Sequence, residues 1–355
     1  MNKKYLYLLP LFSLAVAGTT YAGNPDRQGE AGAYELLINP WARSAGLHTM
    51  NTSSVSGAEA IQINVAGLCR VDKTQAMFGH TRYLVGADVN LNAFGLAQKV
   101  GKHGAFGVQL MGVDFGDIPV TTTLTPEGDG STFSPSFFNI ALSYAHMFEN
   151  KVSVGVTVKS INESVANASA RAVALDAGVQ YVTGEKDNFK LGISLRNVGN
   201  KMRFTGDGLS QQTPNPDGTF SYPLTYNNRG AGYELPSQLN IGTSYDWILG
   251  KENRLSLIGN FTSNSFSRDN VGTALELSVG KMFSLRTGYK FEFGTNKKTT
   301  DPRAIDPSVD NGVSAGLSFN LPLKKGSSSR LGFDYAYQQT SIWQGIHSFS
   351  LRIDL

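Results

Sequence analysis

The feature that most constrains this chain is a two-residue alternation of apolar and polar side chains, which recurs from about residue 75 to residue 355. The last stretch, residues 347–355, shows the alternation most clearly. On one face lie His347, Phe349, Leu351, Ile353 and Leu355, and on the other lie Ser348, Ser350, Arg352 and Asp354. Successive side chains of a β-strand point to opposite faces, so such a stretch has one apolar and one polar face. Helical periodicity is scarce, and we predict an all-β chain.

Fourteen segments follow this pattern, some more strongly than others. They are 75–84, 88–99, 104–113, 137–148, 152–159, 173–181, 189–196, 238–247, 254–263, 271–279, 283–292, 313–321, 331–338 and 347–355. Most approach the roughly 9–11 residues that a tilted strand needs to cross a bilayer. Strands of a soluble sandwich also alternate, with the apolar face turned inward, so periodicity alone does not separate the two architectures.

The lengths of the connections favour a membrane barrel. Short turns are predicted at 100–104, 149–151, 183–188, 249–253, 280–282 and 324–329. Longer polar connections lie between them at 114–136, 163–170, 197–236, 264–270 and 293–311. Outer-membrane barrels sort short periplasmic turns from longer extracellular loops in this way. The connection near 85–87 is the exception, because it is short where a loop is expected. We therefore predict a transmembrane antiparallel β-barrel of about 14 strands over residues 75–355.

Composition agrees with a barrel. The chain has 39 Gly, 20 Phe and 14 Tyr, and charged residues make up only 17%. No internal stretch approaches the roughly 20 apolar residues of a membrane helix. Lipid offers no partner to open backbone groups, so a chain of this kind has to cross the membrane as a closed barrel.

The N-terminus has the layout of a cleaved secretory signal peptide over residues 1–22. Lys3 and Lys4 precede an apolar stretch at 5–17, and small residues at Thr20 and Ala22 allow cleavage before Gly23. Removal takes away two of the 31 basic residues and none of the 28 acidic ones, and 29 − 28 leaves a charge of +1. Such a balance gives no indication of nucleic-acid binding.

Nothing in the sequence indicates an enzyme, a cofactor or a metal. Cys69 is the only cysteine, which excludes an internal disulfide, and it is interpreted as a half-buried, weakly reactive thiol. None of the five histidines lies beside a Ser or Asp at an accessible rim, so no nucleophile–base pair is predicted. Asp114, Asp117 and Asp129 share a loop but lack the spacing of metal ligands.

Residues 23–74 do not alternate, and we predict that they form a compact plug or hatch inside the barrel. Pro40 and paired small residues make 34–46 a poor strand, whereas 58–68 suits a short helix and a tight turn. The alternative is a disordered periplasmic tail, but the segment is too apolar for one. The candidate plug and lumen residues, of which the last three belong to a mixed-charge network on the strands, are Arg43, Asn64, Gly67, Asp176, Arg196 and Arg286.

The two longest loops combine aromatic residues with prolines, which suits ordered loops that contact proteins. The candidate partner-binding residues are Phe133, Phe137, Tyr222, Tyr226 and Tyr233. The alternative is that these loops fold over the barrel mouth and pack on one another.

Several short motifs resemble a known family. Trp41-Ala42-Arg43-Ser44-Ala45-Gly46 resembles the AR-x-A-G element near the start of the PorV/PorQ family. Asn64-Val65-Ala66-Gly67-Leu68 is similar to the N-P-A-G-L element that this family shares with FadL-type barrels, with Val65 in place of proline. The stretches 116–119 and 174–178 also resemble the family, and the likeness covers roughly residues 35–200.

The resemblance implies a fourteen-stranded FadL-like barrel in the outer membrane of a Bacteroidota-type bacterium, in contact with outer-membrane lipid. It also implies a non-enzymatic role in type IX secretion or surface-protein assembly, in which extracellular loops bind secretion-system or cargo proteins. PorV, PorQ and other paralogues are not distinguished by these motifs. The alternative function is a FadL-like transporter of hydrophobic small molecules, which predicts an apolar pocket beneath the loops and a lateral opening near Gly112 and Gly116.

Overall fold

The computed structural model describes residues 24–149, 151–214, 223–250, 252–293, 311–323, 329–340 and 344–355. The predicted signal peptide and Tyr222 lie outside these ranges.

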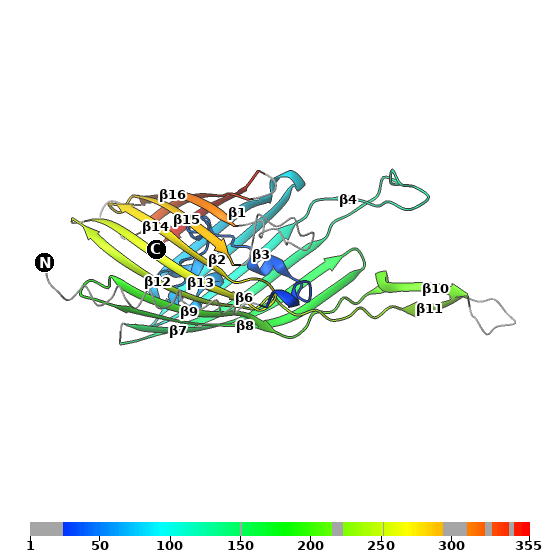
Figure 1. Cartoon of the computed structure of the whole chain (residues 1–355), viewed down its shortest axis with the longest axis horizontal. Helices are drawn as coiled ribbons and strands as arrows, with labels where there is room; N and C mark the ends of the chain where they lie inside the picture. Colours follow the sequence, from blue (N-terminus) through cyan, green and yellow to red (C-terminus); the bar gives the residue numbers. More distant parts are fainter. Residues whose placement is uncertain are drawn as a thin grey trace.

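Fourteen strands close into one antiparallel barrel, in which each strand pairs with its neighbours in chain order and β18 closes onto β1 (Figure 1). They are β1 (Thr74–Leu84), β2 (Val89–Val100), β3 (Gly104–Asp114), β6 (Ser136–Phe148), β7 (Val152–Val165), β8 (Ala168–Thr183), β9 (Phe189–Gly199), β12 (Gln238–Leu249), β13 (Asn253–Asn264), β14 (Asn270–Val279), β15 (Phe283–Glu292), β16 (Gly312–Pro322), β17 (Arg330–Gln338) and β18 (Ile346–Asp354). The predicted fold class and strand number are confirmed.

The apolar face of each strand points outward. In β7, Val154, Val156 and Val158 are 39%, 53% and 48% exposed, whereas Thr157 and Lys159 at alternate positions are buried. A soluble barrel would turn the valines inward, because their exposure to water is unfavourable. The observed direction suits a lipid environment and removes the ambiguity left by periodicity.

The predicted long connection at 163–170 is wrong. Strands β7 and β8 continue until Val165 pairs with Ala168 across a two-residue turn, in which Ala166 has a φ of 47°. Left-handed backbone at the first turn position is typical of tight hairpins. The polar side chains of this region belong to strand ends that extend beyond the apolar belt, which is the outward apolar surface that faces lipid. Beyond the lipid, outward side chains need not be apolar.

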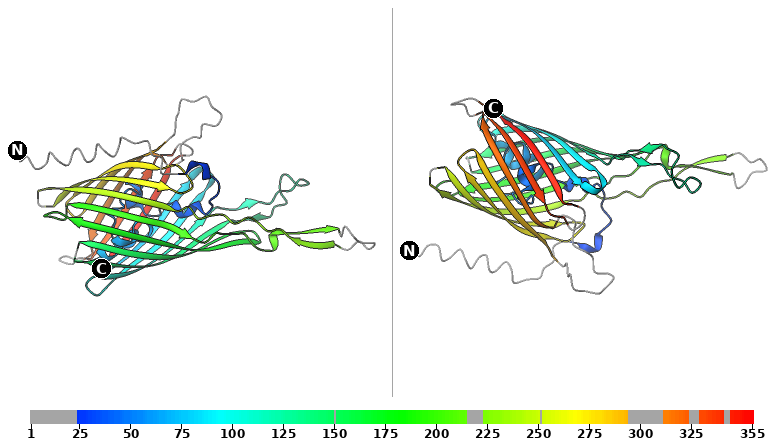
Figure 2. Two further views of the ribbon diagram at one scale, coloured as in Figure 1. Left: turned by 60° about the horizontal axis from the view of Figure 1, so that its bottom comes forward. Right: turned by 90° about the horizontal axis from the view of Figure 1, so that it is seen from above.

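Two loops form small hairpins that project from the same end of the barrel (Figures 1 and 2). One pairs β4 (Ile118–Pro119) with β5 (Thr132–Phe133), and the other pairs β10 (Ser210–Pro214) with β11 (Pro223–Asn227). We call this the loop end and the opposite one the turn end. The first connection remains short and contains η7 (Val85–Ala87).

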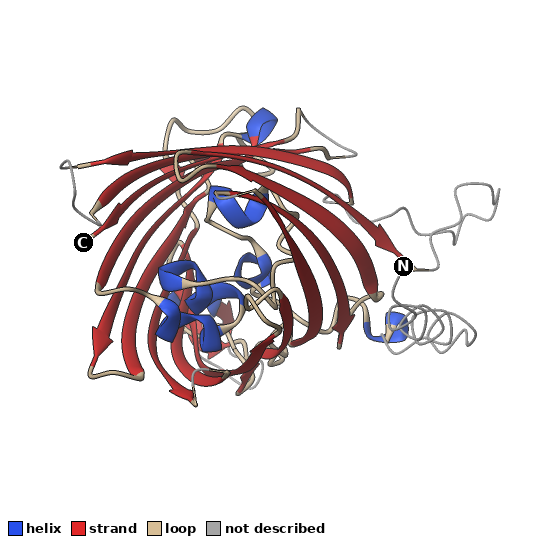
Figure 3. Ribbon diagram, turned by 90° about the vertical axis from the view of Figure 1, so that its left-hand side faces the viewer, coloured by secondary structure: helices blue, strands red, loops and turns tan. Residues whose placement is uncertain are grey.

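The chain before β1 enters the barrel from the loop end. After η3 (Pro25–Arg27), Gly32 donates a backbone hydrogen bond to Glu234 at the rim. Residues 34–73 then lie inside the ring of strands, as Figure 3 shows along the barrel, and we call them the luminal segment. The luminal segment contains η4 (Tyr34–Leu37), α2 (Ala42–Ala45), η5 (Gly57–Glu59), α3 (Ala60–Ile63) and η6 (Val65–Arg70). No helix among the described residues is long and apolar enough to cross a membrane.

Inward-facing glycines form much of the surface on which the luminal segment rests. A Cβ atom at Gly178 would lie 2.0 Å from Oδ1 of Asn64, and one at Gly155 would lie 2.8 Å from the backbone of Val65. Further strand glycines that the luminal segment approaches as closely are Gly79, Gly107, Gly192 and Gly272. The high glycine content is therefore explained partly by the close seating of a chain segment against the barrel wall.

Candidate functional site

The lumen, which is the candidate site, has two chemically different halves. Strands β1 to β8 direct mostly apolar side chains inward, among them Met77, Leu91, Met111, Val113, Phe137 and Ile161. Strands β12 to β18 direct mostly polar and charged side chains inward, among them Asn240, Asn260, Glu276, Arg286, Asp334 and Arg352. We call these the apolar half and the polar half.

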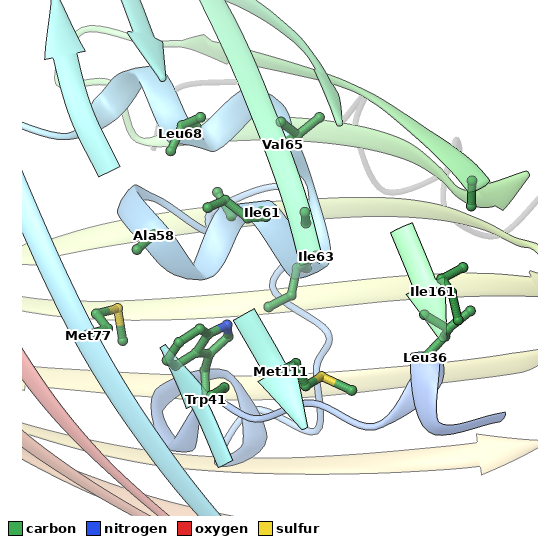
Figure 4. Close-up of a cluster of buried hydrophobic side chains, with 14 of the residues drawn as sticks. Leu36, Trp41, Ala58, Ile61, Ile63, Val65, Leu68, Met77, Met111 and Ile161 are labelled. Atoms are coloured by element: carbon green, nitrogen blue, oxygen red, sulfur yellow. The ribbon is translucent and has the colours of Figure 1, made fainter. Parts of the chain in front are cut away.

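The luminal segment packs its apolar side chains against the apolar half (Figure 4). Leu36, Trp41, Ile61 and Leu68 are at most 1% exposed and belong to one cluster with the strand residues. Burial of each such side chain contributes roughly 1.5–3 kcal/mol. The cluster therefore holds the luminal segment on this side of the barrel.

A polar residue, Asn139, lies among the apolar side chains of the apolar half. Asn139 of β6 is 1% exposed and stands between Met111 and Ile161 in the strand ladders. Neither its side-chain oxygen nor its nitrogen has a hydrogen-bond partner among the described residues, and the same holds for the indole nitrogen of Trp41. Buried polar atoms are nearly always paired, so this wall has hydrogen-bonding capacity that the protein does not use.

Asp176 and Arg196 lie together at a bulge between β8 and β9. Lys159 is fully buried there, 2.5 Å from Asp176, and also donates to the side-chain oxygen of Asn197 at 2.9 Å. The Asn197 backbone, with a φ of 59°, donates to Asp176 at 2.7 Å. Arg196 donates to the carbonyl of Leu36 at 3.2 Å and so links the bulge to the luminal segment.

Arg286 belongs to a second network in the polar half. It lies 2.6 Å from Glu276, which Arg254 contacts at 2.8 Å, and Lys190 lies 2.7 Å from Asp246. Opposite charges alternate along the wall, so each buried charge has a partner, as burial of ions in a protein requires.

Arg43 reaches from α2 toward this network. Burial opposes ionisation of its guanidinium, but the carboxylates around it outweigh that effect and hold its pKa above the ordinary value; they are Glu276, Glu59, Asp334 and Asp354. Within the luminal segment, Ser44 donates a hydrogen bond to Glu59. Burial raises the pKa of the Glu59 carboxyl above its ordinary value, although Arg43 and Ser44 act in the opposite direction.

Asn64 and Gly67 shape the turn that leads into η6. The Asn64 side chain accepts from the backbone of Ala66 at 3.2 Å and donates to the carbonyls of Thr52 at 2.9 Å and Val179 at 3.1 Å. A Cβ atom at Gly67 would lie 2.1 Å from the Val55 carbonyl oxygen, so only glycine fits there. These contacts give a physical reason for an Asn and a Gly three residues apart.

Cavities occupy the polar half at both ends of the lumen. The loop-end cavity has a volume of about 320 Å³ and is lined by residues that include Asn240, Asn260 and Arg196. Turn-end cavities of about 380 and 330 Å³ both include Arg43. The strip 47–54 of the luminal segment lies between them, because His48, Thr49 and Met50 line the first and Leu47, Asn51, Ser53 and Ser54 line the last.

The candidate loop residues have different positions. Phe133 is half-buried in β5, and Tyr226 is 49% exposed in β11. Tyr233 packs on Phe204 and donates to the carboxylate of Glu163 at 2.6 Å, which fits a loop folded over the barrel mouth.

Three placements expected from the sequence are wrong. Phe137 does not lie in an exposed loop: it is an inward residue of β6, 2% exposed, because only one of two consecutive aromatics can face the lipid. No opening exists at Gly112, which pairs with Asn92 and Phe138 in unbroken ladders. Cys69 is fully buried rather than half-buried.

Comparisons with known proteins show the fold. No family model matches the sequence, and no curated protein matches it. The CymD monoaromatic hydrocarbon channel has a TM-score of 0.52 at 14% identity, over 89% of this chain and 97% of that chain. The Pseudomonas putida toluene transporter TodX has a TM-score of 0.51 at 13% identity, over 89% and 97%. A Pseudomonas aeruginosa FadL homologue has a TM-score of 0.50 at 13% identity, over 88% and 97%. These structures do not confirm the PorV/PorQ resemblance.

Proposed function

We propose that this chain carries small hydrophobic molecules across the outer membrane of a Gram-negative bacterium, with the luminal segment acting as a hatch. The observation that carries the proposal is the apolar half of the lumen, which continues toward the loop end through the partly buried residues Tyr83, Leu84, Phe115 and Phe204. The solved structures of the same fold include proteins described as a toluene transporter and monoaromatic hydrocarbon channels, which supports this choice.

The apolar half suits varied apolar substrates. Met77, Met111 and Met202 line the buried cluster, and methionine side chains adapt to irregular shapes. The unpaired amide of Asn139 would accept or donate a hydrogen bond when a substrate carries a polar substituent. Because the cluster is closely packed around Leu36 and Trp41, passage requires displacement of the luminal segment.

Uptake by whole cells tests the proposal, since the lipopolysaccharide leaflet of an outer membrane excludes hydrophobic solutes that would cross a simple bilayer. Cells that express the chain should take up a radiolabelled monoaromatic hydrocarbon faster than cells with an empty vector. Met111→Gln, which places an amide in the apolar half, should abolish the gain; Met282→Gln, at a position 56% exposed, should not. Equal uptake with and without the chain, at matched levels of folded barrel, would refute the proposal.

The projecting hairpins favour a second candidate function. In this function, PorV/PorQ-like loops bind secretion-system or cargo proteins in type IX secretion. Ile118 and Leu124 are 40% and 92% exposed on the first hairpin, and Tyr226 is exposed on the second. Affinity purification in mild detergent should then recover protein partners that are lost when residues 118–133 are replaced by a short Gly-Ser turn. Recovery of the barrel alone would count against this function.

We also propose that the chain is exported by a signal peptide cleaved before Gly23, which makes Gly23 the mature N-terminus. The intact mass of the protein purified from membranes tests this directly. A mass that includes residues 1–22 would contradict it.

A further inference from the structure

We infer that the loop-end cavity of the polar half binds a small, uncharged, hydroxyl-rich molecule such as a mono- or disaccharide. This inference goes beyond the proposed transport of hydrophobic molecules, because it concerns the opposite wall of the lumen and a different ligand chemistry. The cavity of about 320 Å³ falls within the usual range of roughly 300–1,000 Å³ for small-molecule sites.

The cavity wall is a ladder of amide and hydroxyl side chains from β12 and β13. Gln238 donates to Asn264 at 2.7 Å, and Thr262 donates to Asn240 at 2.7 Å and accepts from Asn260 at 3.1 Å. Every amide carries both donors and acceptors, which matches hydroxyl groups, since each hydroxyl also donates and accepts. The wall is therefore complementary to a ligand with many hydroxyls.

Charge excludes other ligand classes. Among the residues that the structure describes, no Asp or Glu lines the cavity, so a cation would find no carboxylate among them. Among the described lining residues, Arg196 and Lys290 carry a positive charge, but Arg196 donates to the Leu36 carbonyl, and Lys290 also interacts within the protein. Both charges are thus already engaged by protein groups, and a neutral polar ligand fits best.

Tyr34 and Tyr83 add aromatic surface to the cavity, and Tyr34 is 42% exposed. The C–H faces of a sugar ring are apolar and pack against aromatic rings, whereas its hydroxyls point sideways to polar groups. Amphipathic aromatic residues such as tyrosine suit this mixed contact. The ring surface and the amide ladder together provide the two kinds of contact that a saccharide needs.

Two side chains in the wall have hydrogen-bonding capacity that the protein does not use. The side-chain oxygens of Asn260 and Asn270 have no partner among the described residues, although Asn260 is only 6% exposed. Native structures rarely leave such groups unpaired. A bound hydroxyl donor would satisfy them.

The floor of the cavity includes His48 and Thr49, with φ values of 53° and 61°. Left-handed backbone at two consecutive non-glycine residues stores strain, a feature that clusters at ligand sites and switches. An occupant of the cavity would therefore rest directly on a strained part of the luminal segment.

Ligand-observed NMR by saturation transfer tests the inference on the full barrel in a detergent without a sugar headgroup. The probes are maltose, gluconate and toluene. We expect saturation transfer to maltose in the wild type and at least a tenfold weaker affinity in Asn240→Leu/Asn260→Leu. Thr262→Val, a nearly isosteric change, should weaken binding less and guards against loss of folding in the first variant. Asn320→Leu, an inward amide that lines a turn-end cavity instead, is the matched control.

Absence of maltose binding to the folded wild type would overturn the inference. Retained binding in the double variant would overturn the location, and stronger binding of gluconate than of maltose would overturn the neutral ligand class. Hydrocarbon uptake measured on the same variants keeps the two proposals separate. The double variant should lose maltose binding and retain uptake, whereas Met111→Gln should do the reverse.

Discussion

Replacement of Gly178 by alanine should release the luminal segment while leaving the barrel intact. The strand itself tolerates alanine, because the backbone of Gly178 is not in the left-handed region and Gly is less favourable than Ala in a strand. The new Cβ would nevertheless lie 2.0 Å from Oδ1 of Asn64, which therefore has to move.

The magnitude follows from what Asn64 loses. Its side chain makes hydrogen bonds with Thr52, Val179 and Ala66 at 2.9, 3.1 and 3.2 Å. At about 0.5–1.5 kcal/mol for each of the three, seating of the luminal segment weakens by roughly 1.5–4.5 kcal/mol. Since 1.4 kcal/mol is a factor of ten, the population with a displaced luminal segment should rise about 10- to 1,000-fold.

The single cysteine provides the assay. Cys69 lies in η6, five residues after Asn64, and is fully buried. When opening and closing are fast, its reaction with a water-soluble maleimide follows the population of the open form. Labelling of Gly178→Ala should accelerate by the factor above, whereas heat-modifiable migration on a gel, which reports the closed barrel, should not change.

Two variants control this reasoning. Gly112→Ala introduces the same change on the outer face, where the nearest atoms lie 3.8 Å from the new Cβ, and should label like the wild type. Asn64→Ala should accelerate labelling on its own, and Gly178→Ala/Asn64→Ala should add little to either single change, because both remove the same contacts. Additive effects, or slow labelling in Gly178→Ala, would refute the account.

Further predictions concern charge and linkage. Burial raises the pKa of the Glu59 carboxyl above its ordinary 4.5, so the folded state holds this proton more tightly than the unfolded state. The free energy of unfolding should therefore fall as pH rises from about 4.5 through the raised pKa. Chemical unfolding from pH 4 to 8 should show a free energy of unfolding that depends less on pH in Glu59→Gln than in the wild type. Lys159→Met leaves Asp176 buried without its cation and should cost about 3–5 kcal/mol, which Lys159→Met/Asp176→Leu should largely recover in the same unfolding assay. Maltose at ten times its dissociation constant should slow labelling of Cys69 about elevenfold in Gly178→Ala. An unchanged labelling rate would show that ligand binding in the loop-end cavity does not stabilise the luminal segment.

The strands could be predicted from the sequence because the bilayer imposes one rule on every one of them. The exterior must be apolar at alternate positions, and this made Val152 recognisable as the first residue of its strand. The rule ends with the apolar belt. The prediction therefore stopped near residue 159, although Asn162, Glu163 and Ser164 continue the ladder with β8.

Contacts in the lumen could not be predicted in the same way. Asp176 and Gly178 were visible as polar or small residues on an inward face, but nothing local to them indicates that Asn64, more than a hundred residues earlier, rests on Gly178. The misplacement of Phe137 has a different cause. Either phenylalanine suits a lipid-facing position by itself, but Phe138 lies on the same face as Ile140 and Leu142, so alternation carried back to the start of β6 turns Phe137 inward.

The sequence does indicate that the lumen has an apolar half and a polar half. The indication is the type of residue at inward positions, which alternation alone does not consider. Inward positions of β2 include Leu91, Ala93 and Ala97, so the inward face of that strand is apolar, whereas inward positions of β13 include Ser256, Asn260 and Asn264. An apolar inward face needs an apolar partner inside the barrel, and the luminal segment is the part of the described chain that supplies one. On the polar side, the same segment is held by directional bonds, such as those from Ser314 to the Gly46 carbonyl and from the Ala42 backbone to Ser350. Displacement toward the polar half would break these bonds as well as the apolar packing, so the residues that set the threshold for opening lie on the wall opposite the proposed hydrophobic path.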